Sequence, residues 1–423
     1  MWEKLRQIFK IRDLRNKIIF VVAMLVVFRL AAHIPVPGVN AENLKNFLAG
    51  NQILGLLNIF SGGTMENFSI IMLGVSPYIT ASIIFQLLGM IVPRLEEMSK
   101  EGESGQQKIN MYTRLATVPL ALLQSYGMIK LLSGAQYNIV ADLSVMKLFT
   151  MMITITAGTL FLMWIGELIT EKNIGNGVSL LIFAGIVASL PKAIQNFVVN
   201  YNAADLYTYI LFLVIAVITI VGVVIISEGQ RNIPVNYAKQ IRGNSSYGGN
   251  STSLPLRVNM AGVIPIIFAV SLILFPSMIS QFFANGSGMS ATIARHVISL
   301  FSNQLFYGVL YFLLVFGFTY FYTAVIFQPQ KIAENLQRQG GFVPGIRPGK
   351  QTEEYLQKTM FRLVFAGALF LGVIAILPLI LKAFTGTQSL VIGGTSLLII
   401  VSVAIETTKQ IDSQMKVHEY DRA

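Results

Sequence analysis

The stretch LYTYILFLVIAVITIVGVVIIS, residues 206–227, contains no charged side chain. It is long enough to cross a bilayer, because a hydrocarbon core of about 30 Å needs about 20 apolar residues of helix. Nine more apolar runs recur along the 423 residues and leave too little chain for a separate soluble domain. We therefore expect an all-α membrane protein with ten transmembrane helices, at residues 18–34, 68–92, 115–133, 148–170, 177–191, 206–227, 258–283, 304–328, 359–383 and 390–407.

The composition agrees with this fold class. The chain is 54% hydrophobic and only 12% charged, whereas a soluble domain carries about 25% charged residues. Its formal net charge of +11 could suggest a nucleic-acid partner, but the positions of the cations favour another interpretation.

Lysine and arginine gather in alternate gaps between the apolar runs. Of the 31 basic residues, 24 lie on one side; Arg29 lies within the first run, and six lie in the opposite gaps: Lys45, Lys130, Lys147, Lys192, Arg295 and Lys382. Cytoplasmic loops of membrane proteins are rich in lysine and arginine. The asymmetry predicts a multi-pass topology with both termini in the cytoplasm.

Catalytic and metal-binding patterns are weak in this sequence. The chain has no cysteine, which excludes disulfides and thiolate chemistry. His33, His296 and His418 are far apart, and Gln351 stands where a phosphate loop needs serine or threonine. We expect no enzyme activity, no cofactor and no bound metal.

The polar residues inside the predicted spans are mostly neutral, such as Thr80, Gln86, Gln124 and Asn259. An ion-coupled transporter needs ionisable residues near the bilayer midplane, so this interior favours a conduit. The residues alone leave three classes open: an ion-coupled secondary transporter of a small solute, a channel, and an intramembrane enzyme, for which no catalytic pair is visible.

Irregular sequence precedes the second span. Residues 53–63, ILGLLNIFSGG, are apolar but short and glycine-rich, and residues 74–77, GVSP, interrupt the run that follows. Irregular backbone at membrane depth is tolerated only where protein buries it or where it lines a water-filled cavity. The segment is either re-entrant or an ordinary outer loop, and the pattern does not distinguish the two.

Aliphatic residues one helical turn apart occur in two predicted spans. Val75 and Ile79 share one face, as do Val178 and Ile182. Facing a pore, they would form a hydrophobic constriction; ordinary helix packing gives the same spacing.

The remaining chain divides as follows. Residues 1–17 are predicted to form an amphipathic cytoplasmic segment, 18–191 and 206–407 two five-helix halves of inverted orientation, and 408–423 a cytoplasmic tail. The fifth span should be short and end near Pro191, and Pro265 and Pro276 should kink the seventh. The long cytoplasmic loops 228–257 and 329–358 are predicted to be ordered, hairpin-like projections.

Motifs along the whole chain resemble the SecY family, the central channel subunits of the bacterial Sec protein translocon. They are FR at 28–29 with IPVPG at 34–38, FSGG at 60–63, PYITASII at 77–84, KEGESG at 100–105, IGNG at 174–177, IFAGIV at 182–187, NMAGVIPIIF at 259–268, FVPGIRPG at 342–349 and GGTSLL at 393–398.

The resemblance implies an hourglass channel that passes unfolded secretory polypeptides and releases transmembrane segments sideways into the bacterial cytoplasmic membrane. It implies a pore ring, a plug near residues 53–67, a polar cluster at a lateral gate, and a docking site for a motor or ribosome. The ring residues would be Val75, Ile79, Val178, Ile182, Ile267 and Ile399, and the plug residues Asn58, Ile59, Phe60, Ser61, Gly62, Gly63 and Thr64; the gate residues would be Thr80, Gln124 and Asn259, and the docking residues Arg347, Arg242 and Lys239.

The same resemblance implies partners: the small membrane subunits SecE and SecG, the SecA ATPase, the ribosome, signal peptides and nascent chains, and the lipid bilayer. Two departures weaken the docking site. The loop 238–252 is less basic than the family's usual cluster, and Gln330 stands where arginine is common. Arg347 is then expected to be the main contact.

Overall fold

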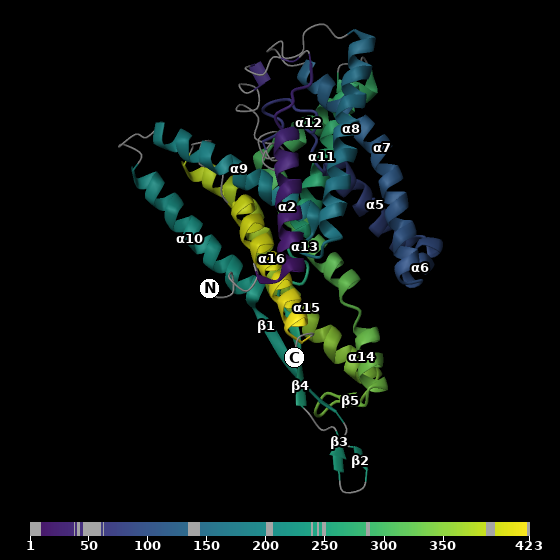
Figure 1. The fold of residues 1–423 in the computed structure, drawn as a ribbon. Helices are drawn as coiled ribbons and strands as arrows, with labels where there is room; N and C mark the ends of the chain where they lie inside the picture. Colours follow the sequence, from purple (N-terminus) through teal and green to yellow (C-terminus); the bar gives the residue numbers. More distant parts are fainter. Residues whose placement is uncertain are drawn as a thin grey trace. The chain divides into compact units, whose positions relative to one another are not determined.

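A computed structural model describes residues 10–37, 39, 43–44, 61, 63–133, 144–199, 206–237, 240–242, 245–247, 251–284, 288–385 and 394–420. The fold is mainly helical, with two small antiparallel sheets (Figure 1). The chain forms two compact units. Unit 1 comprises Met1–Asp205, Val270–Tyr307 and Val403–Ala423, and unit 2 comprises Leu206–Ala269 and Gly308–Ser402.

Unit 1 contains a layer of packed helices. Helix α5 packs against α7, α7 against α8, and α8 against α9, while α2 contacts both α8 and α9. Their bounds are α2 Arg12–Ala31, α5 Ser76–Ile91, α7 Glu103–Ser133, α8 Val145–Thr170 and α9 Gly177–Val199. The predicted amphipathic segment 1–17 overlaps the start of α2, and its residues 1–9 lie outside the described residues.

Proline sets the ends of several helices. Pro77 occupies the first turn of α5, where its missing N–H costs nothing. Val92 is extended, as expected before a proline, and Pro93 begins the short helix α6 (Pro93–Lys100), bent by 100° from α5. Pro191, by contrast, lies inside α9, which continues to Val199. The apolar part of this helix is Gly177–Pro191, so the prediction of a short fifth apolar run is confirmed, although the helix itself is longer.

Three helices have residues in both units. Helix α11 (Ile264–Ala284) begins one residue before Pro265 and contains Pro276. Pro265 therefore lies in the first turn, where proline is tolerated, and it does not kink the helix as predicted. Helices α13 (Gln304–Ile326) and α16 (Gly394–Tyr420) also contribute to each unit, and α12 (Met289–Ser302) belongs to unit 1.

Unit 2 contains the apolar helix α10 (Leu206–Glu228) and the long helix α15 (Lys350–Thr385). Beyond α10, strand β1 (Gln230–Tyr237) pairs antiparallel with β4 (Ser251–Arg257) and with the short strand β5 (Gly341–Phe342), and β2 (Gln240–Arg242) pairs with β3 (Ser245–Tyr247). The predicted hairpin in 228–257 is confirmed (Figure 1). The segment 329–358 differs from the predicted hairpin: it consists of α14 (Pro329–Arg338), β5 and the first turns of α15.

Each of the ten predicted apolar runs contains a helix. Among the described residues, five helices are long and apolar enough to cross a membrane, or six if the bent pair α5 and α6 counts as one span. Within the described part of the chain, α9 and α11 contribute only the shorter apolar helices Gly177–Pro191 and Ile264–Ile273, so the count of ten spans stays a prediction.

Candidate functional site

The start of α5 holds the first two predicted ring residues. Gly74 has a φ of +58°, a conformation that favours glycine, and Val75 follows as the N-cap residue. The Ile79 backbone N–H donates to the Val75 carbonyl at 3.0 Å. Val75 and Ile79 are 5% and 7% exposed, and their spacing places them on one face of the helix.

The start of α9 is fixed by an asparagine cap. Asn176 Oδ1 accepts a hydrogen bond from the Ser179 N–H at 3.1 Å, and the Asn176 carbonyl accepts from Leu180 at 2.9 Å. The Gly177 N–H donates to Thr170 Oγ1 at 2.9 Å. These bonds satisfy N–H groups that a helix start leaves without a partner.

Close contact with α8 restricts where α9 can lie. A side chain at Gly177 would collide with the Gly166 carbonyl, and a methyl group at Gly166 would lie 3.6 Å from Val178 Cγ2. Val178 therefore packs partly against α8. Ile182, one turn later, is buried.

The turn between α8 and α9 is anchored from two other helices. Gln414 Nε2 on α16 donates to the Asn173 carbonyl at 2.6 Å, and Lys172 Nζ lies 4.9 Å from the ring centre of Phe20 on α2. Asn173 has a positive φ of 55°. The role of Gln414 could not be predicted from the sequence, because 241 residues separate it from Asn173 and no local pattern marks such a contact.

The other two predicted ring residues belong to unit 2. Ile267 on α11 and Ile399 on α16 are both buried. Burial fits a closed constriction and ordinary packing equally well. The ring of six side chains stays a prediction.

A buried segment without regular structure, residues 63–75, leads into α5. Met65, Phe68, Met72 and Leu73 pack with side chains of α7 and α8 in one apolar cluster. The cluster residues on the two helices are Met128, Ile129, Leu132, Met151 and Ile155. This segment, which we call the buried turn, is held by apolar contacts rather than by a helical hydrogen-bond pattern.

The buried turn also pairs with the segment after α2. The Val36 N–H donates to the Phe68 carbonyl at 2.8 Å, and the Ile70 N–H donates to the Ile34 carbonyl at 3.0 Å. A methyl group at Gly158, near the middle of α8, would collide with the Ile70 carbonyl. Ile70 lies within the predicted second span, so this contact does not decide between a re-entrant segment and an outer loop for residues 53–63, of which 53–60 and 62 lie outside the described residues.

Three of the predicted plug residues lie in the described part of the chain. Ser61 and Thr64 are buried, Thr64 Oγ1 lies 3.0 Å from the Ser61 carbonyl, and Gly63 has a φ of +75°. A methyl group at Gly74 would lie 3.3 Å from Ser61 Cα, so Ser61 packs against the buried turn. Asn58, Ile59, Phe60 and Gly62 lie outside the described residues.

The predicted gate residues are buried on three elements. Thr80 Oγ1 donates to the Ser76 carbonyl at 3.0 Å, and Gln124 lies on α7, which packs against α5. Asn259, in unit 2, donates from Nδ2 to the Gly262 carbonyl at 3.3 Å, while its Oδ1 has no partner among the described residues. Their grouping into one gate stays a prediction.

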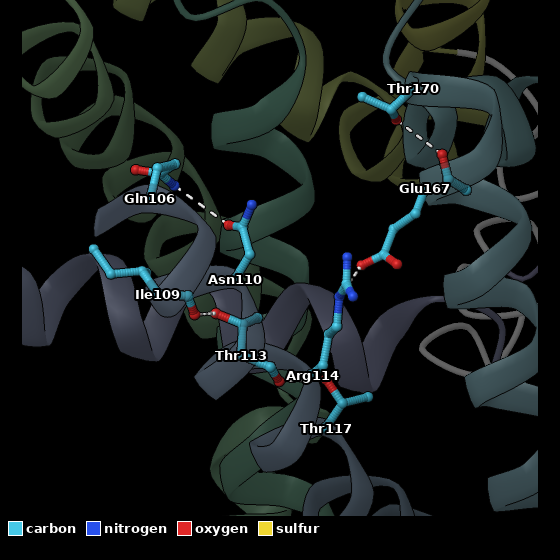
Figure 2. A network of polar contacts seen from close by, with 9 residues as sticks. Gln106, Ile109, Asn110, Thr113, Arg114, Thr117, Glu167 and Thr170 are labelled. Carbon is cyan, nitrogen blue, oxygen red and sulfur yellow. Dashed lines mark hydrogen bonds and ion pairs between the residues drawn. The ribbon is translucent and has the colours of Figure 1, made fainter. Parts of the chain in front are cut away.

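A polar network joins α7 and α8 (Figure 2). Arg114 Nε lies 2.6 Å from Glu167 Oε1, and Thr113 and Thr117 donate to carbonyls one turn earlier in α7. The pair is partly exposed, so its contribution to stability is small. Its members are 53 residues apart, and the sequence did not predict the contact.

The sheet of unit 2 rests on its own apolar core. Ile233, Val235 and Leu256 pack with residues of α13, α14 and α15 in one cluster. The other buried members are Phe327, Leu336, Val343, Leu356, Met360 and Val364. We call this sheet, together with α14 and the first turns of α15, the projection.

Cations lie at the rim of the projection. Arg347 is exposed and its carbonyl accepts from Thr352 Oγ1 at 2.9 Å; Gly345 and Gly349 flank it with φ values of +82° and +93°. Arg242 is part of β2, and Lys239 lies outside the described residues. Among residues 229–257 the sequence has no aspartate or glutamate, so the charge of this hairpin is not offset within it.

In the described part of the chain, no three histidine, aspartate or glutamate residues come together as a metal site would need.

Comparisons with known proteins give a consistent result. The SecY family model matches residues 69–408. A "Protein translocase subunit SecY" of Halalkalibacterium halodurans is 44% identical, with 99% of each chain covered. A solved structure titled "The structure of a protein conducting channel" has a TM-score of 0.64 at 18% identity and covers 96% of this chain and 93% of its own. "Sec61 in the Canine ribosome-channel complex from the endoplasmic reticulum" has a TM-score of 0.64 at 17% identity, with 96% and 94% covered.

Proposed function

This chain belongs to the SecY family of multi-pass membrane proteins, and from this premise we propose that it is a protein-conducting channel. It passes unfolded secretory polypeptides across the membrane and releases transmembrane segments sideways into the lipid. The observation that carries the proposal is the match to translocase subunits over 99% of the chain.

The constriction of this channel is proposed to consist of Val75, Ile79, Val178, Ile182, Ile267 and Ile399. Aliphatic side chains make no directional bonds, so they can close around any passing sequence. When no chain passes, a narrow apolar ring excludes water and ions by dewetting. The one-turn spacing of Val75 and Ile79 at the start of α5 places both side chains on one face, as a ring requires.

The plug is proposed to lie beneath this ring. Its described residue Ser61 packs against Gly74 of the buried turn, which includes Gly63 and Thr64 and leads through the ring residue Val75 into α5. A movement of the plug would therefore act on a segment that is continuous with the constriction.

Lateral release follows from the energetics of transfer into lipid. On the insertion scale, an apolar residue at the bilayer centre is favourable by about 0.3–0.6 kcal/mol and a charged one costs about 2.5–3.5 kcal/mol. A segment exposed to lipid through an opening between α5 and α11 would partition between the aqueous channel and the bilayer according to the summed insertion free energy of its residues. Thr80, Gln124 and Asn259 would form the polar cluster at this gate.

The energy for transport is proposed to come from a partner, because we assign no catalysis to this chain. The projection would dock the SecA motor or the ribosome through Arg347, with Arg242 and Lys239 contributing, and SecE and SecG would complete the channel. The bacterial cytoplasmic membrane, with both termini in the cytoplasm, is the proposed location, and the bias of lysine and arginine supports it.

The alternative, an ion-coupled transporter, is not favoured by the comparisons. A crosslinking experiment distinguishes the two. A secretory chain stalled during export should crosslink to photoreactive probes at positions 79 and 267. Saturable uptake of a small solute by proteoliposomes, with no such crosslinks, would overturn the channel.

The ring itself is tested by Ile79→Ser. A hydroxyl in the constriction lets water wet it, so the resting ion conductance in planar bilayers should rise several-fold. Ile79→Val keeps the site aliphatic and serves as the control. Equal conductance for the serine variant and the unaltered chain would remove Ile79 from the ring.

A further inference from the structure

Helix α12 turns an apolar face away from unit 1. Met289, Ile293 and Leu300 are 83%, 58% and 47% exposed, whereas Ala291 and Ala294 are buried. With about 3.6 residues per turn, the three exposed residues fall on one side of the helix and the two alanines on the other. Ordinary amphipathic helices of soluble proteins have the reverse arrangement, with the apolar side inward.

The end of α12 is joined rigidly to the start of α13. Asn303 Oδ1 accepts hydrogen bonds from the Leu305 and Phe306 N–H groups at 3.0 and 3.3 Å. The Phe301 and Phe306 rings meet edge to face with centroids 5.7 Å apart. One residue separates the two helices, so the exposed face of α12 adjoins the first turn of α13.

That first turn is itself apolar and exposed. Leu305 is 77% exposed, and α13 lies within a stretch, Gln304–Arg338, that is long and apolar enough to cross a membrane. In a membrane protein such a side chain is covered by lipid. The exposed face of α12 continues this lipid-covered surface.

The charge of the region suits a lipid surface. Arg295 and His296 are exposed on α12, and residues 229–333 of the sequence contain no aspartate or glutamate. A helix with apolar side chains on one face and a cation such as Arg295 beside it binds at the membrane interface and is attracted to anionic phospholipids.

We propose that α12 lies in the membrane–water interface on the side opposite the lysine- and arginine-rich loops, with Met289, Ile293 and Leu300 in the acyl chains and Arg295 at the phosphates. The partner of this face is the anionic bilayer itself. Anchored there, α12 fixes the junction between α11 and α13 at the membrane surface.

The absence of cysteine from the chain permits a direct test. A single cysteine is introduced at Ile293 or, as the control, at exposed Ser302, nine residues later and half a turn around the helix. Each is labelled with a bimane fluorophore. The full-length protein is then reconstituted, without other polypeptides, into phosphatidylcholine–phosphatidylglycerol vesicles. Quenching by aqueous iodide is compared with quenching by phosphatidylcholine that carries a nitroxide near its headgroup.

The Ile293 probe should be quenched by the lipid nitroxide and about threefold less by iodide than the Ser302 probe, as expected for a side chain at the acyl boundary. The Ile293 probe should be quenched more by the lipid nitroxide in vesicles with phosphatidylglycerol than in vesicles without it. Adding Arg295→Ala should reduce this difference in quenching. Equal iodide access at both positions would overturn the proposal. Protection from iodide without lipid quenching would also overturn it, and would point to a second copy of the chain. Because translocation is not measured, the result is independent of the proposed function.

Discussion

The buried turn of unit 1 and the projection of unit 2 are both irregular parts of a helical protein, but different forces hold them. The buried turn carries a single charged residue, Glu66, packs on two apolar helices, and pairs by backbone hydrogen bonds with residues 34–36. The projection has a sheet, a compact apolar core and exposed cations at its rim. The apolar packing of the buried turn suits the proposed constriction, which must accept any polypeptide, and the cations of the projection suit the proposed docking surface.

The largest effect on stability is expected in the core of the projection. Leu356 is completely buried there, so Leu356→Ala should lower the free energy of unfolding by about 2–5 kcal/mol. In limited proteolysis, the projection of the Leu356→Ala variant should be cut earlier than the projection of the unaltered chain, while the buried turn of both stays protected. Exposed Gln357→Ala is the control. Equal proteolysis of both variants would mean that the projection has no core of its own.

A smaller effect is expected from Gly158→Ala in α8. The added methyl group collides with the Ile70 carbonyl of the buried turn, and overpacking of this kind costs about 1–3 kcal/mol. Thermal unfolding in detergent measures the change.

Gly89 on α5 provides a matched control, because a methyl group there meets no atom within 4 Å. Gly89→Ala should be stabilising by about 0.5–1 kcal/mol, since alanine favours the helix. Effects of the same sign for both variants would contradict the close contact between α8 and the buried turn.

Gln414→Ala sharpens the comparison within unit 1. It removes the hydrogen bond from α16 to the Asn173 carbonyl, which should lower stability by about 1 kcal/mol. Because Asn173 precedes α9 and its proposed ring residues, resting ion conductance should also rise slightly. Ser413→Ala, at the exposed neighbouring residue, should change neither quantity. A Gln414→Ala variant with unaltered stability and conductance would show that this hydrogen bond does not hold the proposed constriction in place.

The smallest change in stability is expected for Arg347→Glu at the rim of the projection. Its side chain is exposed, so thermal unfolding should shift within about 0.5 kcal/mol, yet motor-driven export in proteoliposomes should be lost. Lys331→Glu, an equal charge reversal on α14, tests whether position matters. Normal export with Arg347→Glu would refute docking at this residue.

Much of the fold could be predicted from the sequence. The positions of the apolar helices follow from the hydropathy summed over neighbouring residues. The predicted side of the cations follows from the lysine and arginine counted in each gap between apolar runs, and a sequence displays both directly. The spacing of Val75 and Ile79 on one face followed from helical geometry in the same way. The extension of α9 past Pro191 was not predicted. A proline removes one backbone N–H from a helix, and only the surrounding structure decides whether the helix tolerates that loss.

Only the tertiary structure decided the contacts between distant residues. The pairing of Arg114 with Glu167, the anchoring of Asn173 by Gln414, the approach of Ile70 to Gly158 and the addition of β5 to β1 join residues far apart in the chain. Apolar periodicity specifies that a helix forms and which face is buried. It does not specify which neighbour covers that face, because apolar packing is non-directional and many partners would suffice.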